Sequence, residues 1–188
     1  MGATALAADA PMDHEHMMHD MLMVSRVSYT VPDIRLRRQS GEAVSLREEM
    51  DDGRPVVLNF IYTSCATTCP MLTQTLSMFE DKLGTDRQKV HLMSISIDPE
   101  QDTPERLTEY AKRFHAGPEW QYYTGTLSAS LAAQHAFDVY RGDKMSHTAV
   151  TLLRASPGQP WQRIEGLVTA DELLQRFREL TTVPLAAK

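Results

Sequence analysis

The chain has 188 residues, of which 42% are hydrophobic, and it carries a formal net charge of −6 at pH 7. This composition can supply the core of one domain, whereas the acidic balance and the lack of a basic cluster argue against a nucleic-acid-binding protein. No apolar run approaches the ~20 residues that a membrane-spanning helix requires.

The first residues resemble the end of a secretory signal. Residues 5–8 read Ala-Leu-Ala-Ala, which has the small-residue character of a cleavage region. We interpret them as the remnant of a removed or truncated signal peptide, with a frayed alanine-rich terminus as the alternative. The remnant predicts a periplasmic protein, working where disulfides can persist.

Residues 1–25 are predicted to form a flexible tail rich in methionine and histidine. Thioethers suit Cu(I), and imidazoles suit both copper oxidation states. The tail is therefore a candidate secondary copper-binding segment, with a solvated tail or a small docked helix as the alternatives. Its candidate ligands are His14, His16, His19, Met17, Met18, Met21 and Met23.

Residues 26–188 are expected to form the folded domain, which opens with a hairpin. Apolar and polar residues alternate in residues 34–36 and 44–46, on either side of Ser40 and Gly41. A turn at residues 51–55 then leads into the next strand.

The stretch from Val56 onward contains both cysteines. Residues 56–61 form an apolar run typical of a strand buried on both faces, and Pro70 suits the first turn of a helix. Cys65 and Cys69 therefore lie between a core strand and a helix N-terminus. The helix dipole at such a place lowers a thiol pKa and favours the thiolate.

Thiolates are nucleophiles and soft metal ligands, so two chemical roles are open for this pair. A structural disulfide between Cys65 and Cys69 would close a very short loop and stabilise the fold little. We therefore favour metal binding over thiol redox chemistry, and both over an interaction domain with an inert disulfide.

The middle of the chain predicts a parallel crossover. Residues 90–97 form a second buried strand after the first helix, and strand, helix, strand in this order is right-handed and parallel. A further helix follows with Pro104 in its first turn, capped by Thr103 or Asp102.

The last third completes a thioredoxin-like order. We expect a short strand at residues 121–123, a helix at 127–137, an antiparallel pair at 148–153 and 162–164, and a final helix after a capping box at 169–172. The predicted fold class is α/β, with a central mixed sheet flanked by helices and an N-terminal β-hairpin extension.

His147 precedes the first strand of the late hairpin. In a thioredoxin-like sheet this edge faces the cysteine turn, so His147 could meet Cys65 and Cys69. Two thiolates and one imidazole form a soft trigonal site that suits copper. Met145 would point the same way in an extended chain and is a possible axial group. The remaining histidines of the domain are interpreted as surface or satisfied core residues: His91, His115 and His135.

These features together resemble the Sco/SenC family of copper-binding, thioredoxin-like assembly proteins. The matching features are Cys-x-x-x-Cys-Pro at residues 65–70, Asp-Pro-x-x-Asp-Thr-Pro at residues 98–104, and the later His147. The resemblance covers about residues 30 to 182. It implies that Cys65, Cys69 and His147 are the copper ligands.

The resemblance further implies a periplasmic copper chaperone rather than an enzyme. Its expected partner is a copper-accepting respiratory protein, such as the copper A centre of cytochrome c oxidase, with other periplasmic copper chaperones or thioredoxin-like reductants as further partners. The alternative is a thiol–disulfide reductase that uses Cys65 and Cys69 as a redox pair to keep acceptor cysteines reduced. A peroxidase ranks third, because Tyr62 stands where peroxiredoxins place a threonine.

Overall fold

The computed structural model describes residues 22–182, which form a layered α/β domain. A mixed eight-stranded sheet lies at its centre, in the order β1-β8-β7-β4-β5-β6-β2-β3. The strands are β1 (Met23–Val27), β2 (Arg35–Arg38), β3 (Ala43–Ser45), β4 (Val56–Ile61), β5 (His91–Ser96), β6 (Trp120–Thr124), β7 (Val150–Arg154) and β8 (Trp161–Glu165). The predicted mixed sheet is confirmed.

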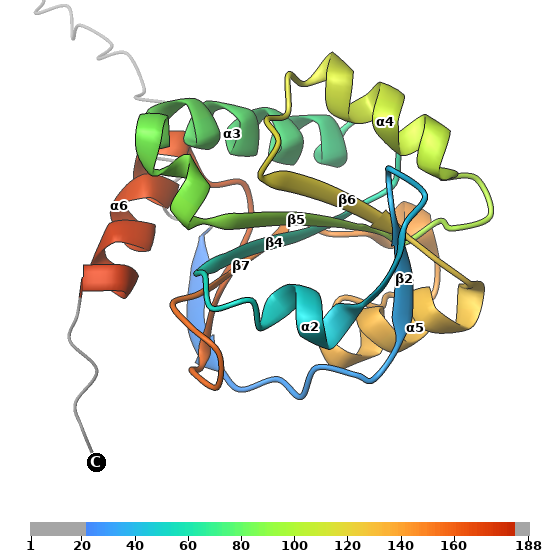
Figure 1. Cartoon of the computed structure of the whole chain (residues 1–188), viewed down its shortest axis with the longest axis horizontal. Coiled ribbons are helices and arrows are strands. Elements are labelled where there is room, and N and C mark those ends of the chain that lie inside the picture. The colour runs from blue at the N-terminus through green and yellow to red at the C-terminus, as the bar shows by residue number, and fades with distance from the viewer. Residues whose placement is uncertain (1–21, 183–188) are drawn as a thin grey trace, which may run out of the picture.

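Helices cover both faces of this sheet (Figure 1). They are α2 (Leu46–Met50), α3 (Thr68–Leu83), α4 (Pro104–Arg113), α5 (Leu127–Ala136) and α6 (Ala170–Thr182), with 3-10 turns η1 (Gly84–Lys89) and η2 (Lys144–Ser146). In Figure 1, α3 and α4 lie above the sheet and α2 and α5 below it, while α6 packs beside α3. Within the described part of the chain, no helix combines the length and apolarity needed to cross a membrane.

The two central strands confirm the predicted crossover. Every residue of β4 and β5 is buried, and the two strands pair in parallel from Val56 opposite His91 to Ile61 opposite Ser96. Helices on both faces explain why these strands read as nearly continuous apolar runs. After Ile61 the backbone leaves the carboxyl end of β4, and the loop that follows carries Cys65 toward the start of α3.

The N-terminal hairpin is also confirmed, with one difference at its end. Strands β2 and β3 pair antiparallel, with Leu36 opposite Val44, and β2 continues the sheet beside β6. Leu46, expected to end the second strand, instead begins α2. The Ser45 side chain accepts a hydrogen bond from the Glu48 N–H, and this N-cap turns the backbone into the helix.

The predicted end of the tail at residue 25 falls inside β1. Met23 to Val27 pair antiparallel with β8, and Met23 lies opposite Glu165. Four of the five β1 side chains are exposed, so the strand has no buried face to produce an alternating pattern. This strand forms because its backbone hydrogen-bonds to β8. The sequence of β1 itself therefore carries no pattern that would predict a strand.

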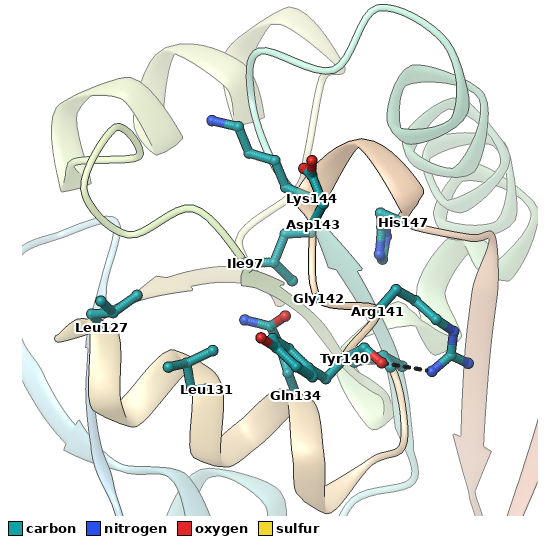
Figure 2. A pocket seen from close by; sticks show the side chains of 11 residues that line it. Ile97, Leu127, Leu131, Gln134, Tyr140, Arg141, Gly142, Asp143, Lys144 and His147 are labelled. Atoms are coloured by element: carbon teal, nitrogen blue, oxygen red, sulfur yellow. Dashed lines mark hydrogen bonds between the residues drawn. The ribbon is translucent and has the colours of Figure 1, made fainter.

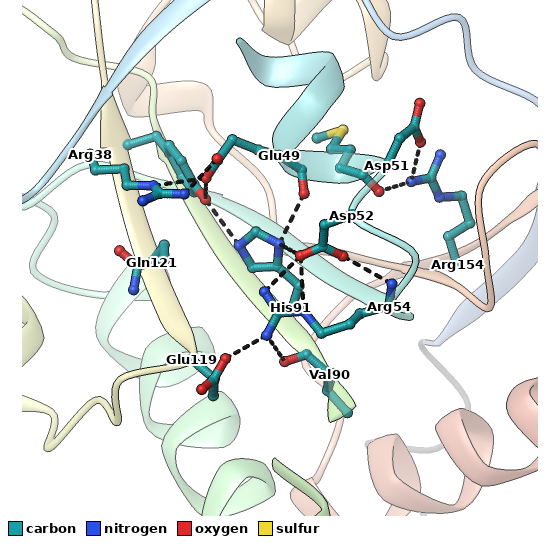
Figure 3. Close-up of polar contacts among 12 residues, drawn as sticks. Arg38, Glu49, Asp51, Asp52, Arg54, Val90, His91, Glu119, Gln121 and Arg154 are labelled. Carbon is teal, nitrogen blue, oxygen red and sulfur yellow. Dashed lines mark hydrogen bonds and ion pairs between the residues drawn. The ribbon is translucent and has the colours of Figure 1, made fainter. Parts of the chain in front are cut away.

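A polar network fixes the sheet at the end opposite the cysteines, where β4 and β5 begin (Figure 3). The buried His91 ring donates from Nδ1 to the Glu49 carbonyl at 3.0 Å, and its Nε2 lies 3.0 Å from the Tyr123 hydroxyl. The Glu49 carboxylate pairs with Arg38 at 2.6 Å. These contacts tie α2 to the sheet and identify His91 as a satisfied core residue.

Candidate metal centre

The β4–α3 junction holds the two cysteines at the first turn of a long helix. The N-cap residue Thr67 makes no side-chain capping bond. The Cys65 sulfur instead accepts a hydrogen bond from the Cys69 backbone N–H at 3.4 Å. A helix leaves its first N–H groups without intrahelical partners, so a sulfur here is held by the donors that stabilise a thiolate.

The two thiols, which form no disulfide with each other, differ sharply in acidity. Burial acts to raise the pKa of Cys65, but hydrogen bonds from the backbone N–H groups of Cys69 and Thr67 outweigh it and lower the pKa to about 7. Burial raises the pKa of the fully enclosed Cys69 to about 12. Cys65 is therefore the partly exposed, reactive thiol, and Cys69 is the protonated thiol behind it.

This asymmetry predicts how the metal-free, reduced protein reacts with iodoacetamide. Alkylation of Cys65 should rise with pH and reach half its maximal rate near pH 7, because only the thiolate reacts. Alkylation of Cys69 should stay slow throughout that range. Mass spectrometry across pH 5.5–9 measures both, with urea-unfolded protein as the control. A midpoint for Cys65 at about 8.5, the value of a free cysteine, would contradict the assigned environment.

Asp102 anchors the loop that carries Cys65. Its fully buried carboxylate accepts the Thr63 backbone N–H at 3.2 Å and the Thr63 hydroxyl at 2.5 Å. It also accepts the Ser96 hydroxyl at 2.6 Å. Thr103, rather than Asp102, caps α4. The Asp102 alternative for that cap is therefore wrong, because the carboxylate points into the core toward the cysteine loop.

His147 lies across the end of β4 and has one free ring nitrogen. Its Nε2 is 2.9 Å from the Phe60 carbonyl, which can only accept, so Nε2 carries the proton. Nδ1 is buried, and among the described residues it has no hydrogen-bond partner. Burial lowers the pKa of this imidazole. A neutral ring with an unpaired Nδ1 lone pair has the form in which histidine ligates a metal.

Two contacts hold the His147 loop against the cysteine side of the fold. Lys144 pairs with Asp98 at 2.6 Å, which ties η2 to the end of β5. The Tyr62 ring stands edge-on to the His147 ring, with centroids 6.4 Å apart. Met145 lies in the 3-10 turn η2, so the extended conformation expected for it is wrong. Its sulfur accepts from the Tyr62 hydroxyl at 3.7 Å.

A cavity of about 290 Å³ opens on the α5 side of His147 (Figure 2). Leu127, Leu131 and Gln134 project into it from α5, opposite Tyr140 and Arg141 of the loop that leads to His147. The cavity gives space beside the histidine. Neither cysteine lines it, so it adjoins the candidate centre without forming it.

The structure brings Cys65 and Cys69 together and places Tyr62 beside both Cys65 and His147. Among residues 22–182, however, no three His, Cys, Asp or Glu side chains stand together as a ready metal-binding group. Sequence reasoning noted Tyr62 only for its position before Cys65 and did not expect its contact with His147. It missed Lys144 as a neighbour of the site, and no local pattern marked that residue. Of the secondary ligands, Met23 lies in β1 with its side chain exposed, and the rest lie outside the described residues: His14, His16, His19, Met17, Met18 and Met21.

Comparison with known proteins gives one consistent family. A sequence model of the SCO1/SenC family matches residues 25–182. The SCO1 protein homolog of Bacillus subtilis is 32% identical over 106 residues, which cover 56% of this chain and 54% of that protein. A SCO2-like protein of Rickettsia typhi is 26% identical over 67% of this chain and 66% of its own length. The matches thus span about half to two thirds of these relatives.

Solved structures agree with the fold. Bradyrhizobium japonicum ScoI with copper bound superposes with a TM-score of 0.66 at 26% identity, covering 78% of this chain and 96% of that one. Yeast Sco1 with copper bound gives a TM-score of 0.72 at 19% identity, covering 85% and 92%. These likenesses confirm the thioredoxin-like fold.

Proposed function

The chain belongs to the SCO1/SenC family, and from this premise we propose that it is a periplasmic copper chaperone. Copper is its cargo, held by Cys65, Cys69 and His147, and delivered to a respiratory copper enzyme such as the copper A centre of cytochrome c oxidase. ScoI of Bradyrhizobium japonicum and of Arabidopsis thaliana, which are 26% and 25% identical to this chain, have been solved with copper bound.

One observation supports the proposal above all: two thiols free of any disulfide and one imidazole nitrogen lie at the same end of the sheet. Cys65 supplies a thiol with a pKa of about 7, Cys69 adjoins it, and His147 offers an unpartnered Nδ1. Thiolate and imidazole ligands select copper over hard cations. Because no three such ligands stand together within residues 22–182, we expect copper to draw the His147 and cysteine loops together. Such a site can also open to release its cargo.

An anaerobic copper titration tests this function. The reduced protein should bind one copper tightly at the cysteines. Protein with a Cys65–Cys69 disulfide should lose that copper, because the thiolates are consumed. A soluble copper A domain of an oxidase, mixed with the loaded chaperone, should then gain the copper. Equal affinity of reduced and oxidised protein would overturn the proposal.

The proposal includes the methionine- and histidine-rich tail as a second, weaker copper site. Met23 pairs with Glu165, and Glu165 pairs with Val150, three residues after His147. With strands about 4.8 Å apart, the tail joins the domain roughly 10 Å from the start of β7. Tethering so close raises the effective concentration of tail ligands at the main site.

The same titration separates the two sites. The full chain should bind two copper ions, whereas a chain beginning at Leu22, which keeps β1 whole, should bind one. Oxidised full-length protein should retain the weaker copper alone. Cu(II) at the tail should fall away below about pH 6.5 as the imidazoles protonate, while Cu(I) holds through the thioethers. Equal stoichiometry of the full and shortened chains would show that the tail binds no copper.

A thiol–disulfide reductase is the second candidate function. The observation that favours it is the pairing of an acidic, partly exposed Cys65 with a buried, protonated Cys69. That arrangement suits an attacking thiol backed by a second thiol that resolves the mixed disulfide. Insulin reduction at a rate near that of a thioredoxin control, together with weak copper affinity, would favour this alternative.

A further inference from the structure

The side chain of Met145 is hydrophobic but lies in solvent, where it contributes no packing energy to the fold. Its side chain is 74% exposed, the highest value among the large apolar side chains of the described residues. The turn that carries it is nevertheless well fixed. The Met145 backbone N–H donates to the Asp143 carboxylate at 2.9 Å, and the neighbouring Lys144 pairs with Asp98. The backbone of Met145 is therefore held at a defined place, from which its side chain extends over the surface.

That place is beside the candidate centre. The Tyr62 hydroxyl donates to the Met145 sulfur at 3.7 Å, and it lies close enough to the Cys65 thiol that burial and this thiol together raise the pKa of Tyr62. The sulfur atoms of Met145 and Cys65 thus both neighbour the Tyr62 hydroxyl. The Tyr62 ring also contacts His147, which follows Met145 by two residues. Cys65, Met145 and His147 therefore share Tyr62 as a common neighbour.

We propose that Met145 supplies a thioether ligand to copper held by Cys65, Cys69 and His147, and that this ligand biases the site toward Cu(I). The inference rests on the proposed function. A thioether is soft and neutral, so it stabilises Cu(I) and contributes little to Cu(II). Methionine has three rotatable bonds, and the exposed side chain can leave Tyr62 and turn to the metal without disturbing the core.

The test is Met145→Leu, which keeps the volume of the side chain and removes the sulfur. Affinities for each oxidation state are measured by competition with chelators of known strength. Cu(I) affinity should fall about tenfold while Cu(II) affinity stays within about twofold, since changes near a metal site typically alter affinity about 10- to 100-fold. X-ray absorption of the Cu(I) protein should lose one sulfur neighbour.

Met78→Leu is the matched control, because Met78 is an exposed methionine on α3 away from the site. Both variants should have the same midpoint of urea unfolding as the wild-type protein. Unchanged Cu(I) affinity in Met145→Leu, with copper still bound through the cysteines, would overturn this inference and leave the proposed function intact. Absence of copper binding in the wild-type protein would overturn the proposed function itself.

Discussion

Replacing Cys65 with serine or His147 with alanine should remove tight copper binding. As a guide to magnitude, structural Zn²⁺ sites built from thiolates and imidazoles bind with apparent free energies of about 10–16 kcal/mol. Shared over three ligands this is about 4 kcal/mol each, or roughly a thousandfold in affinity. Serine can still accept the Cys69 N–H at the start of α3, so Cys65→Ser should keep its fold. Anaerobic competition with a copper chelator measures the loss.

The histidine variant also separates the two candidate functions. A reductase requires Cys65 and Cys69, whereas His147 lies against Phe60 and Tyr62 and makes no hydrogen bond to a thiol in the described structure. His147→Ala should therefore abolish tight copper binding and leave insulin reduction unchanged. His135→Ala, at an exposed histidine of α5, is the matched control and should change neither. If both Cys65→Ser and His147→Ala still bind one copper tightly, the assignment of these residues as ligands is wrong.

The fold was predictable wherever local patterning carries the information. Strands β4 and β5 are buried on both faces, so their apolar runs are unmistakable, and Pro104 with Thr103 marks the start of α4. Two elements escaped prediction for physical reasons. The edge strand β1 buries almost nothing, and the five residues of α2 are too few to show a helical period.

The candidate site was predictable in its ligand types but not in its supporting contacts. The strand-to-helix position of Cys65 and Cys69 follows from residues close to them in the sequence. The contacts of Asp102 with Thr63, and of Met145 with Tyr62, join residues 39 and 83 positions apart. Nothing local distinguishes a core carboxylate from a helix cap, so Asp102 and Thr103 were equal candidates until the tertiary structure separated them.

Replacing Asp102 with alanine should destabilise the protein by about 3–5 kcal/mol, a large part of the 5–15 kcal/mol that holds a typical domain together. The substitution leaves the Thr63 N–H, the Thr63 hydroxyl and the Ser96 hydroxyl without their buried acceptor. Asp102→Asn retains one carbonyl oxygen for Thr63 and should cost less, about 1–2 kcal/mol. Urea unfolding measures both, with a lower midpoint and an unchanged slope expected.

Glu100→Ala is the control for this series, because Glu100 is exposed in the same turn and its side chain makes no hydrogen bond or ion pair in the described structure. It should leave the midpoint unchanged. Asp102→Asn should remain folded enough for a second measurement, hydrogen exchange of the Thr63 amide. That amide should exchange faster than in the wild type, because the neutral amide oxygen of asparagine accepts its hydrogen bond more weakly than the carboxylate does. An Asp102→Ala variant with the wild-type midpoint of urea unfolding would contradict this prediction. It would show that Asp102 does not anchor the cysteine loop.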